Sequence, residues 1–256
     1  MSEKQTHETV VGGQFGSRAD AYLKSAVHSA GEDLQALVAV ATERAGGKVL
    51  DLGCGGGHVT FNVAPHASSV TAYDLSQEML DVVAGAARDR GLANVKTSRG
   101  VAESLPFEDA SFDLVMSRYS AHHWHDVDAA MREAFRVLKP GGTLAITDSI
   151  SPGRPLLDTF YQTIEMLRDC SHVRNYSRVE WQSSIARAGF VSGEARQFRL
   201  RLDFASWVER MRTPQVQVEA IRALQRTVSE TATAYFETEG DGSFTFDVGF
   251  FRAARP

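Results

Sequence analysis

Residues 48–65 read KVLDLGCGGGHVTFNVAP and place one acid and four glycines between two apolar runs. Val49 and Leu50 are typical of a buried strand, and residues 59–61 of the start of a helix. The glycines between them permit positive backbone φ angles and leave the peptide groups open to a ligand. A strand, a glycine turn and a helix N-terminus together predict a nucleotide-binding corner of the Rossmann kind.

The glycines of this loop match the dinucleotide fingerprint G-x-G-x-x-G only in part. Counted from Gly53 the third glycine would stand at His58, and counted from Gly55 it would stand at Thr60. No G-K-[ST] follows, so the loop is not a P-loop. Asp51 would repel a pyrophosphate but suits a cation such as a ligand ammonium group. The alternative is a glycine turn beside a solvated carboxylate.

The composition of the chain is typical of a globular α/β protein. At 256 residues and a formal net charge of −5, it is long enough for one large domain and has no field that gathers nucleic acid or anionic membrane. We expect no signal peptide and no membrane span, because the first residues are polar and no apolar run is long enough. Cys54 and Cys170 are too few for a disulfide scaffold or a cysteine-based zinc site. These features predict a cytoplasmic protein.

Strand-like and helical segments alternate from residue 48 to 150, which predicts right-handed crossovers and a parallel sheet. Strands are expected at 48–53, 69–74, 94–100, 112–118 and 143–150, and an amphipathic helix from 126 is expected to stop at Pro140-Gly141. Beyond residue 150 the pattern predicts two helical segments, a sixth strand at 193–204, a mostly helical stretch and a seventh strand at 242–255.

Asp74 ends the second predicted strand, 23 positions after Asp51. An acid at this point accepts hydrogen bonds from ribose hydroxyls and disfavours a 2′-phosphate, which argues against NADP. One acid before the glycine turn and a second after the next strand indicate S-adenosylmethionine rather than NAD.

Several segments in chain order carry a family resemblance. VLDLGCGGGHVT, VTAYDLSQEML, AESLPFEDASFDLVMSR, AHHW and AFRVLKPGGTL resemble class I S-adenosylmethionine-dependent methyltransferases of the ubiquinone/menaquinone C-methyltransferase-like group. FGSRADAYLKSAVH, SHVRNYS and SWVERMRTP resemble the bacterial YafE/YcgJ type of that group. The resemblance implies a Rossmann-like, seven-stranded α/β sheet, mostly parallel with the last strand antiparallel, and a small helical cap. The implied parts are an N-terminal helical lid (1–47), the cofactor-binding core (48–150), a cap over the acceptor (151–190) and the C-terminal core with a helical insertion (191–256).

The same resemblance assigns a cofactor site. The implied contacts are Asp51, Gly53, Gly55 and Arg118 at the methionine part, Asp74 at the ribose, Leu75, Met79, Ala102 and Glu103 around adenine, and Tyr22 with Phe15 in the lid. Val101 stands where relatives have an aspartate, so adenine would rely on Glu103, backbone groups or apolar contact. For Arg118 the alternative is a salt bridge to a surface acid, and for Tyr22 it is core packing.

The loop SRYSAHHWH, residues 117–125, follows the fourth strand, where the reactive methyl group is expected. His122 or His123 could act as a base near neutral pH, with Trp124 contacting the acceptor. The alternative is that the histidines only brace the loop. Their spacing does not fit zinc. The loop also lacks the Asn/Asp-Pro-Pro-Tyr/Phe motif of methyltransferases that act on base amines or glutamine amides.

Two polar stretches nearer the C-terminus have functional and structural interpretations. His172, Arg174 and Tyr176 in SHVRNYS could bind an acceptor, since arginine holds a planar carboxylate or enolate well, or could form a polar linker. The arginines of RQFRLRLDF, at positions 196, 199 and 201, could bind RNA or could protect an edge strand from aggregation.

The sequence therefore predicts an enzyme that transfers a methyl group from S-adenosylmethionine to a small-molecule acceptor at carbon, oxygen or ring nitrogen, without a metal. S-adenosylhomocysteine would be the product, and neither nucleic acid nor membrane is expected as a partner. The alternatives are an RNA methyltransferase, a cofactor-binding protein without activity and, least favoured, an NAD-dependent oxidoreductase.

Overall fold

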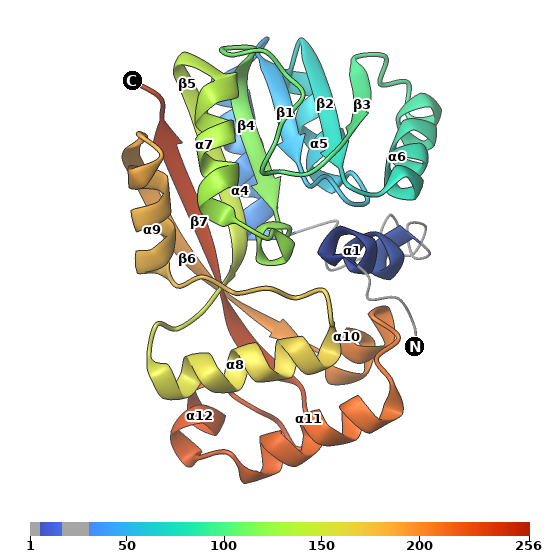
Figure 1. Cartoon of the computed structure of the whole chain (residues 1–256), viewed down its shortest axis with the longest axis vertical. Coiled ribbons are helices and arrows are strands. Elements are labelled where there is room, and N and C mark those ends of the chain that lie inside the picture. The colour runs from blue at the N-terminus through green and yellow to red at the C-terminus, as the bar shows by residue number, and fades with distance from the viewer. Residues whose placement is uncertain (1–5, 17–30) are drawn as a thin grey trace.

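A seven-stranded sheet with the order β3-β2-β1-β4-β5-β7-β6 runs through the molecule. The computed structural model describes residues 6–16 and 31–256 (Figure 1). Only β7 runs antiparallel to its neighbours, β5 and β6, which confirms the predicted fold class. The strands are β1 (Lys48–Leu52), β2 (Ser69–Asp74), β3 (Val95–Arg99), β4 (Phe112–Arg118), β5 (Leu138–Ile150), β6 (Val191–Leu202) and β7 (Phe244–Ala254).

Helices cover both faces of the parallel part of this sheet (Figure 1). Successive residues of β1 point to opposite faces: Val49 packs in a cluster with α4 and α5, whereas Leu50 packs in a cluster with α7 and α9. Burial on both faces explains why β1 and β4 read as nearly continuous apolar runs. The covering elements are α4 (Glu32–Glu43), α5 (His58–Val63), η1 (Ala64–His66), α6 (Gln77–Asp89), η2 (Ala121–His123), α7 (Val127–Val137) and α9 (Arg178–Arg187).

The remaining helices form a second lobe, which we call the cap lobe. Its apolar cluster joins Tyr161 of α8, Trp207 of α10, Phe236 after α12 and Phe244 of β7. Figure 1 shows this lobe on one side of α1 (His7–Gly16) and the ends of the parallel strands on the other. The cap lobe consists of α8 (Pro155–Arg168), α10 (Phe204–Arg210), α11 (Gln215–Thr227), α12 (Glu230–Tyr235) and the adjoining ends of β6 and β7.

The segment 151–190, predicted as one cap, divides between the two lobes. Its first helix, α8, belongs to the cap lobe, but α9 packs against α7 and β7 in the main core. Trp181 stacks on Phe251 with ring centroids 5.7 Å apart, and Ser184 donates a hydrogen bond to Asp128 of α7. The apolar side chains of α9 therefore pack against the sheet, and the cap lobe is completed by α10 to α12 rather than by α9.

Helix α7 ends earlier than predicted, and β5 begins at Leu138 rather than at Thr143. Pro140 disfavours helical geometry at the residue before it, and Leu138 already pairs with Phe112 of β4. Nη1 of Arg255 donates hydrogen bonds to the carbonyls left open at the end of the helix, those of Phe135 at 2.8 Å and Arg136 at 2.9 Å.

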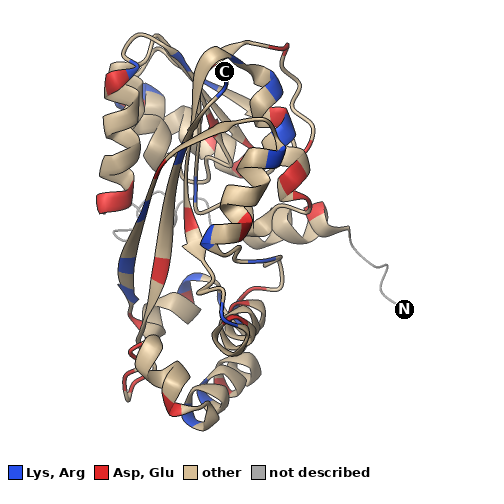
Figure 2. Ribbon diagram, turned by 90° about the vertical axis from the view of Figure 1, so that its left-hand side faces the viewer, with Lys and Arg blue, Asp and Glu red and all other residues tan. Residues whose placement is uncertain are grey.

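The arginines along β6 are all ion-paired. Arg196 lies 2.8 Å from Glu194, Arg199 lies 3.1 Å from Asp247, and Arg201 pairs with Glu239. Figure 2 shows basic and acidic residues interspersed on this face, without a continuous basic stripe. Within residues 6–16 and 31–256, no helix is both long and apolar enough to cross a membrane.

Candidate functional site

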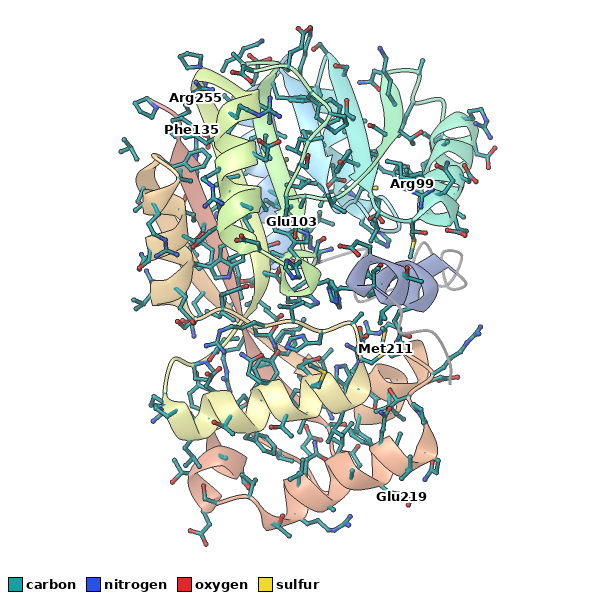
Figure 3. The ribbon with its side chains drawn as sticks, in the orientation of Figure 1. Arg99, Glu103, Phe135, Met211, Glu219 and Arg255 are labelled. Atoms are coloured by element: carbon teal, nitrogen blue, oxygen red, sulfur yellow. The ribbon has the colours of Figure 1, made fainter. Side chains whose placement is uncertain are left out.

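The carboxyl ends of β1, β2 and β4 open onto a cavity that α1 covers, and we call it the first cavity. Figure 3 shows Glu103 at this end of the sheet, facing α1. Every predicted cofactor residue that the structure describes lines it: Asp51, Gly53, Gly55, Asp74, Leu75, Met79, Ala102, Glu103 and Arg118. Residues from four separate segments between Asp51 and Arg118 are thus brought together, as expected for the end of a parallel sheet. Tyr22 lies outside the described residues.

Asp51 is almost fully buried at the end of β1. Its Oδ2 accepts hydrogen bonds from the backbone N–H of Thr60 at 2.9 Å and from the Thr60 hydroxyl at 2.6 Å. Among the described residues, its Oδ1 has no hydrogen-bond partner. Burial raises the pKa of Asp51 to about 7, although the two hydrogen bonds from Thr60 oppose this shift. A buried carboxylate with one open oxygen is suited to a cationic ligand group.

Asp74 closes the other side of the glycine loop. Its Oδ2 accepts the N–H of Gly55 at 2.8 Å, and its Oδ1 accepts the N–H of Ser76 at 2.9 Å. Burial raises the pKa of Asp74. Each carboxylate oxygen can accept more than one hydrogen bond, so capacity for two ligand hydroxyls remains.

Glycine is needed at positions 53 and 55 of the loop for two different physical reasons. A Cβ on Gly53 would lie 1.8 Å from Oγ of Ser120, so the close approach of the His-rich loop requires glycine there. A Cβ on Gly55, at φ +47°, would meet no atom within 4 Å. Since Gly55 lines the first cavity, its missing side chain leaves the cavity open at the loop.

The side of the first cavity beyond Asp74 is mainly apolar. Leu75, Met79 and Ala102 line it, and the carbonyl of Val101 accepts a hydrogen bond from the Tyr73 hydroxyl at 3.1 Å. Glu103 accepts the N–H of Asp126 at 3.1 Å. A flat ring in this part would therefore meet apolar side chains and backbone groups.

Arg118 both lines the first cavity and forms a buried ion pair. Its Nε lies 2.6 Å from Oδ2 of Asp33 on α4, and its guanidinium lies 4.9 Å from the centre of the Tyr119 ring. Sequence reasoning considered a surface acid as the partner and missed Asp33. The available signal was an acid on the apolar face of the helix ending at residue 43.

A second cavity adjoins the first, and Phe15, Tyr119 and His123 line both. His122 lines only the second cavity. Its other walls come from α8, α10 and the ends of β5, β6 and β7, and include Ser149, Glu165, Arg168, Asp169, Leu200, Leu202, Trp207, Arg210 and Phe246. None of these residues was predicted as part of a site, because no motif in their segments indicates which side chains meet.

The two predicted histidines have different environments. Nδ1 of His122 lies 2.6 Å from Oδ1 of Asp148. Burial alone would lower the pKa of His122, but the charge and hydrogen bond of Asp148 outweigh it and raise the pKa. Nδ1 of His123 lies 3.1 Å from the Ser171 carbonyl, and burial together with the neighbouring His122 lowers the pKa of His123 to about 3. Asp148 was missed because an acid inside an apolar strand sequence gives no motif.

The three polar residues predicted in the cap line neither cavity, although the His172 ring lies 5.8 Å from that of His122 and the Arg174 N–H donates to the His122 carbonyl at 3.3 Å. Arg174 is bound by Glu180 at 2.9 Å and Asp158 at 3.2 Å. Nε2 of His172 lies 2.9 Å from the Gln162 side-chain oxygen, and burial lowers the pKa of His172 to about 2. Tyr176 packs edge-on against Trp181. Trp124 differs from these three, since it lines the first cavity and donates its indole N–H to Ser120 at 3.0 Å.

Helix α1 closes the first cavity from the cap side. Nε2 of His7 lies 2.8 Å from the carbonyl oxygen of His123, and the Phe15 ring meets the His123 ring edge-on at 4.9 Å. Phe15, predicted to lie in an N-terminal helical lid, is near the end of this helix.

Comparison with known proteins agrees with this geometry. Residues 50–146 match the family model described as a methyltransferase domain. The chain is 53% identical over 192 residues to the uncharacterized protein YafE of Escherichia coli strain K12, which covers 75% of this chain and 93% of YafE. It is 36% identical over 115 residues to the demethylmenaquinone methyltransferase of Chlorobaculum parvum, covering 44% of this chain and 46% of that protein.

The methyltransferase YcgJ of Bacillus subtilis is similar in both sequence and structure. It is 38% identical over 200 residues, which cover 78% of this chain and 79% of YcgJ. The YcgJ crystal structure superposes with a TM-score of 0.83 at 33% identity, covering 87% of this chain and 97% of that chain. The chain therefore belongs to the class I S-adenosylmethionine-dependent methyltransferases, in the group of YafE, YcgJ and the ubiquinone/menaquinone C-methyltransferases.

Proposed function

We propose that this methyltransferase holds S-adenosylmethionine in the first cavity and transfers its methyl group to a small-molecule acceptor in the second. The observation that carries the proposal is the open Oδ1 of buried Asp51 on the wall of the first cavity. An ammonium group of the methionine part would donate a hydrogen bond to this oxygen, and its positive charge would keep the carboxylate ionised. The cofactor, when bound, supplies a methyl group that its sulfonium has already activated.

The other walls of the first cavity suit the rest of that molecule. Asp74 would accept hydrogen bonds from the ribose hydroxyls while it keeps the N–H of Gly55. The open space above Gly55 would admit the chain between ribose and sulfur. Leu75, Met79 and Ala102 would pack against adenine, with Glu103 at its edge. Arg118, held by Asp33, would fix the wall beside the methionine part.

Of the two histidines, the geometry favours His122 as a base. Asp148 holds Nδ1 of His122, and the imidazole lines the second cavity. The His123 ring contacts the Ser171 carbonyl, and the backbone carbonyl of His123 contacts the His7 ring. We therefore assign His123 a structural role in holding the loop. We likewise assign Arg174 to the structure of the cap, because Asp158 and Glu180 balance its charge.

A small acceptor fits this site better than a nucleic acid. The second cavity lies between two lobes and under α1, and the arginines of β6 are ion-paired. The demethylmenaquinone methyltransferase among the relatives is, by its name, a small-molecule enzyme. Proximity and orientation in such an enclosed site can supply about 7–11 kcal/mol of the barrier reduction.

Two measurements test this function. Calorimetry on the full chain should show binding of S-adenosylmethionine and S-adenosylhomocysteine, and weaker binding of the former to Asp51→Asn. Incubation of a metabolite extract with methyl-labelled cofactor should then yield a labelled small molecule. Binding of NAD without binding of either sulfur compound would contradict the cofactor assignment, and label found only in RNA would contradict the acceptor class.

A further inference from the structure

The segment between α8 and α9, residues 169–177, crosses between the two lobes (Figure 1). We call it the connecting segment. The sequence predicts acceptor-binding residues here, but the backbone of the segment contacts the loop that carries His122. The N–H groups of Val173 and Arg174 donate to the carbonyl of His122, at 2.8 and 3.3 Å. The connecting segment thus holds the backbone of the residue proposed as the base.

Asn175 is the most tightly fixed part of this segment. It is almost fully buried, and the side chain of Gln162 on α8 binds its backbone twice. Oε1 of Gln162 accepts the N–H of Asn175 at 3.0 Å, and Nε2 of Gln162 donates to the carbonyl of Asn175 at 2.7 Å. These two bonds fix the point from which the Asn175 side chain reaches β5.

The Asn175 side chain meets Ser149, which follows Asp148 on β5. Oγ of Ser149 lies 2.5 Å from Oδ1 of Asn175 and 3.3 Å from Oδ1 of Asp148. Hydrogen bonds of the O–H···O type are about 2.5–3.0 Å long, whereas those of the N–H···O type are about 2.7–3.2 Å long. The short distance therefore indicates that the amide oxygen faces Ser149 and that the hydroxyl donates its proton to Asn175 rather than to Asp148.

This orientation leaves the other end of the Asn175 amide without a partner. Within residues 6–16 and 31–256, no atom accepts a hydrogen bond from Nδ2 of Asn175, although this nitrogen is buried. A buried N–H without an acceptor costs folding free energy, and an apolar side chain of similar size would avoid that cost. Such an arrangement is expected where the amide oxygen has a function beyond packing.

The function follows from the hydrogen bonds that Asp148 already accepts. Its Oδ1 accepts a bond from Nδ1 of His122 at 2.6 Å and one from the N–H of Ser149 at 2.8 Å. A further donor on this oxygen would share its negative charge and weaken its attraction for a protonated imidazole. The Ser149 hydroxyl, 3.3 Å away, would be that donor if Asn175 did not hold it.

We propose that Asn175 is a positioning residue for the base: it accepts the hydroxyl of Ser149 and so keeps the charge of Asp148 for His122. This inference rests on the proposed function, in which His122 takes a proton from the acceptor. The other charged or titratable groups around His122 and Asp148 stay unchanged in the comparisons below: Tyr119, His123, Tyr161, Glu165, Arg168, Asp169, His172 and Arg210.

The test measures the pKa of His122 by side-chain NMR of the full chain without ligand, with its signal identified by the loss of that signal in His122→Asn. In Asn175→Ala the freed hydroxyl should turn to Asp148. The pKa of His122 should then fall by roughly 1 pH unit, as expected for one hydrogen bond to a charged group. Asn175→Asp keeps an acceptor for the hydroxyl and should show no fall. Asn62→Ala, on the exposed side of α5, is the control and should leave the pKa unchanged.

Removal of the hydroxyl tests its part directly. In Ser149→Ala the pKa of His122 should not fall, and the addition of Asn175→Ala to this variant should cause no further change. Asn175→Leu, which fills a similar volume without an acceptor, takes the place of Asn175→Ala if that variant does not fold. A merely structural role of Asn175 would lower the stability in both backgrounds and leave the pKa of His122 where it is.

Two outcomes would overturn the proposal. One is an unchanged pKa of His122 in folded Asn175→Ala or Asn175→Leu, and the other is an equal fall when Ser149 is already alanine. The pKa is measured without cofactor and without acceptor, so it does not depend on the proposed function. If the pKa responds as expected while His122→Asn keeps full turnover, the proposed role of His122 as a base fails, whereas the effect of Asn175 on the pair of Asp148 and His122 stands.

Discussion

Nδ1 of His122 lies 2.6 Å from Oδ1 of Asp148, and Oδ2 of Asp148 accepts the N–H of Ala121 at 2.8 Å. One buried carboxylate at the end of β5 therefore fixes both the backbone of the His-rich loop and the orientation of its imidazole. A carboxylate on Nδ1 favours the tautomer whose other nitrogen is a proton acceptor. The pairing turns a histidine that could brace a loop into a candidate base.

Asp148→Asn should lower turnover of a hydroxyl acceptor by roughly 10²-fold, the lower end of the range for general-base catalysis. The base works when it is deprotonated, so the rate should rise with pH through the pKa of His122, which Asp148 raises. Without the carboxylate charge, the midpoint of the pH–rate profile should move to lower pH. Asp148→Glu, which keeps the carboxylate, should have a midpoint closer to that of the unchanged protein. A lower rate with an unchanged midpoint would indicate a purely structural role.

Separate substitution of the two histidines distinguishes a catalytic base from a residue that only holds the loop. His122→Asn should lower kcat by roughly 10²–10⁴-fold with little change in cofactor affinity, because only the proton acceptor is lost. His123→Asn should change kcat far less, since its ring is bound to Ser171 and its pKa is already low. Steady-state kinetics beside calorimetry of S-adenosylhomocysteine checks both variants. Equal losses in the two would contradict the assignment of His122.

Asp51→Asn should stabilise the cofactor-free protein at alkaline pH while weakening cofactor binding. Burial raises the pKa of Asp51 to about 7, while the unfolded chain ionises this group near its ordinary pKa of about 3.9. The cost in folding free energy therefore builds up as the pH rises from about 4 to about 7 and stays constant above that. We expect a gain on the order of 2 kcal/mol or more near pH 9, a smaller gain near pH 5 and little difference near pH 4. Thermal unfolding across pH measures this, with Asp89→Asn on the exposed end of α6 as the control. A gain that does not depend on pH would contradict the buried charge as its cause.

Asp74→Ala should weaken binding of S-adenosylmethionine by roughly 1–3 kcal/mol, as expected for the loss of a charged hydrogen-bond acceptor. Gly55→Val should weaken it more, because its side chain would enter the space that the loop leaves open and would strain a positive φ. Calorimetry on both variants measures the loss, and circular dichroism checks their fold. Unchanged affinity in both would remove the first cavity as the cofactor site.

Arg174→Ala should leave the KM of the acceptor unchanged. Its guanidinium is paired with Glu180 and Asp158, and Arg174 lines neither cavity. Partly exposed ion pairs contribute about 0–1 kcal/mol, so the stability should fall only slightly. Kinetics with the true acceptor, together with denaturant unfolding, checks this. A severalfold rise in the KM of the acceptor at unchanged stability would contradict this and indicate that Arg174 binds the acceptor.

The sequence by itself determined the fold class and most of the strand-end residues that line the first cavity. Alternation of apolar strands with helices specified the parallel sheet, because the spacing of apolar residues distinguishes a strand from a helix. The glycine loop and the two acids were recognisable because they lie within a few residues of strand ends, where chain order alone places them at one edge. For this reason a local pattern was enough to predict that Asp51, Gly55, Asp74 and Met79 lie together at one edge of the sheet.

The acceptor half was decided only by the tertiary structure. Leu200 and Trp207 are far from Phe246 in the sequence, and no local pattern links the three. They meet because the cap lobe folds around the ends of β6 and β7. Asp148 is ordinary in the sequence of a strand, and only its 2.6 Å contact gives His122 a role. Arg174 is conspicuous in the sequence, yet the helix that begins after it supplies Glu180 as its partner. Local patterns specify secondary structure and strand-end motifs, whereas the pairing of charges and the walls of a cavity depend on which distant segments pack together.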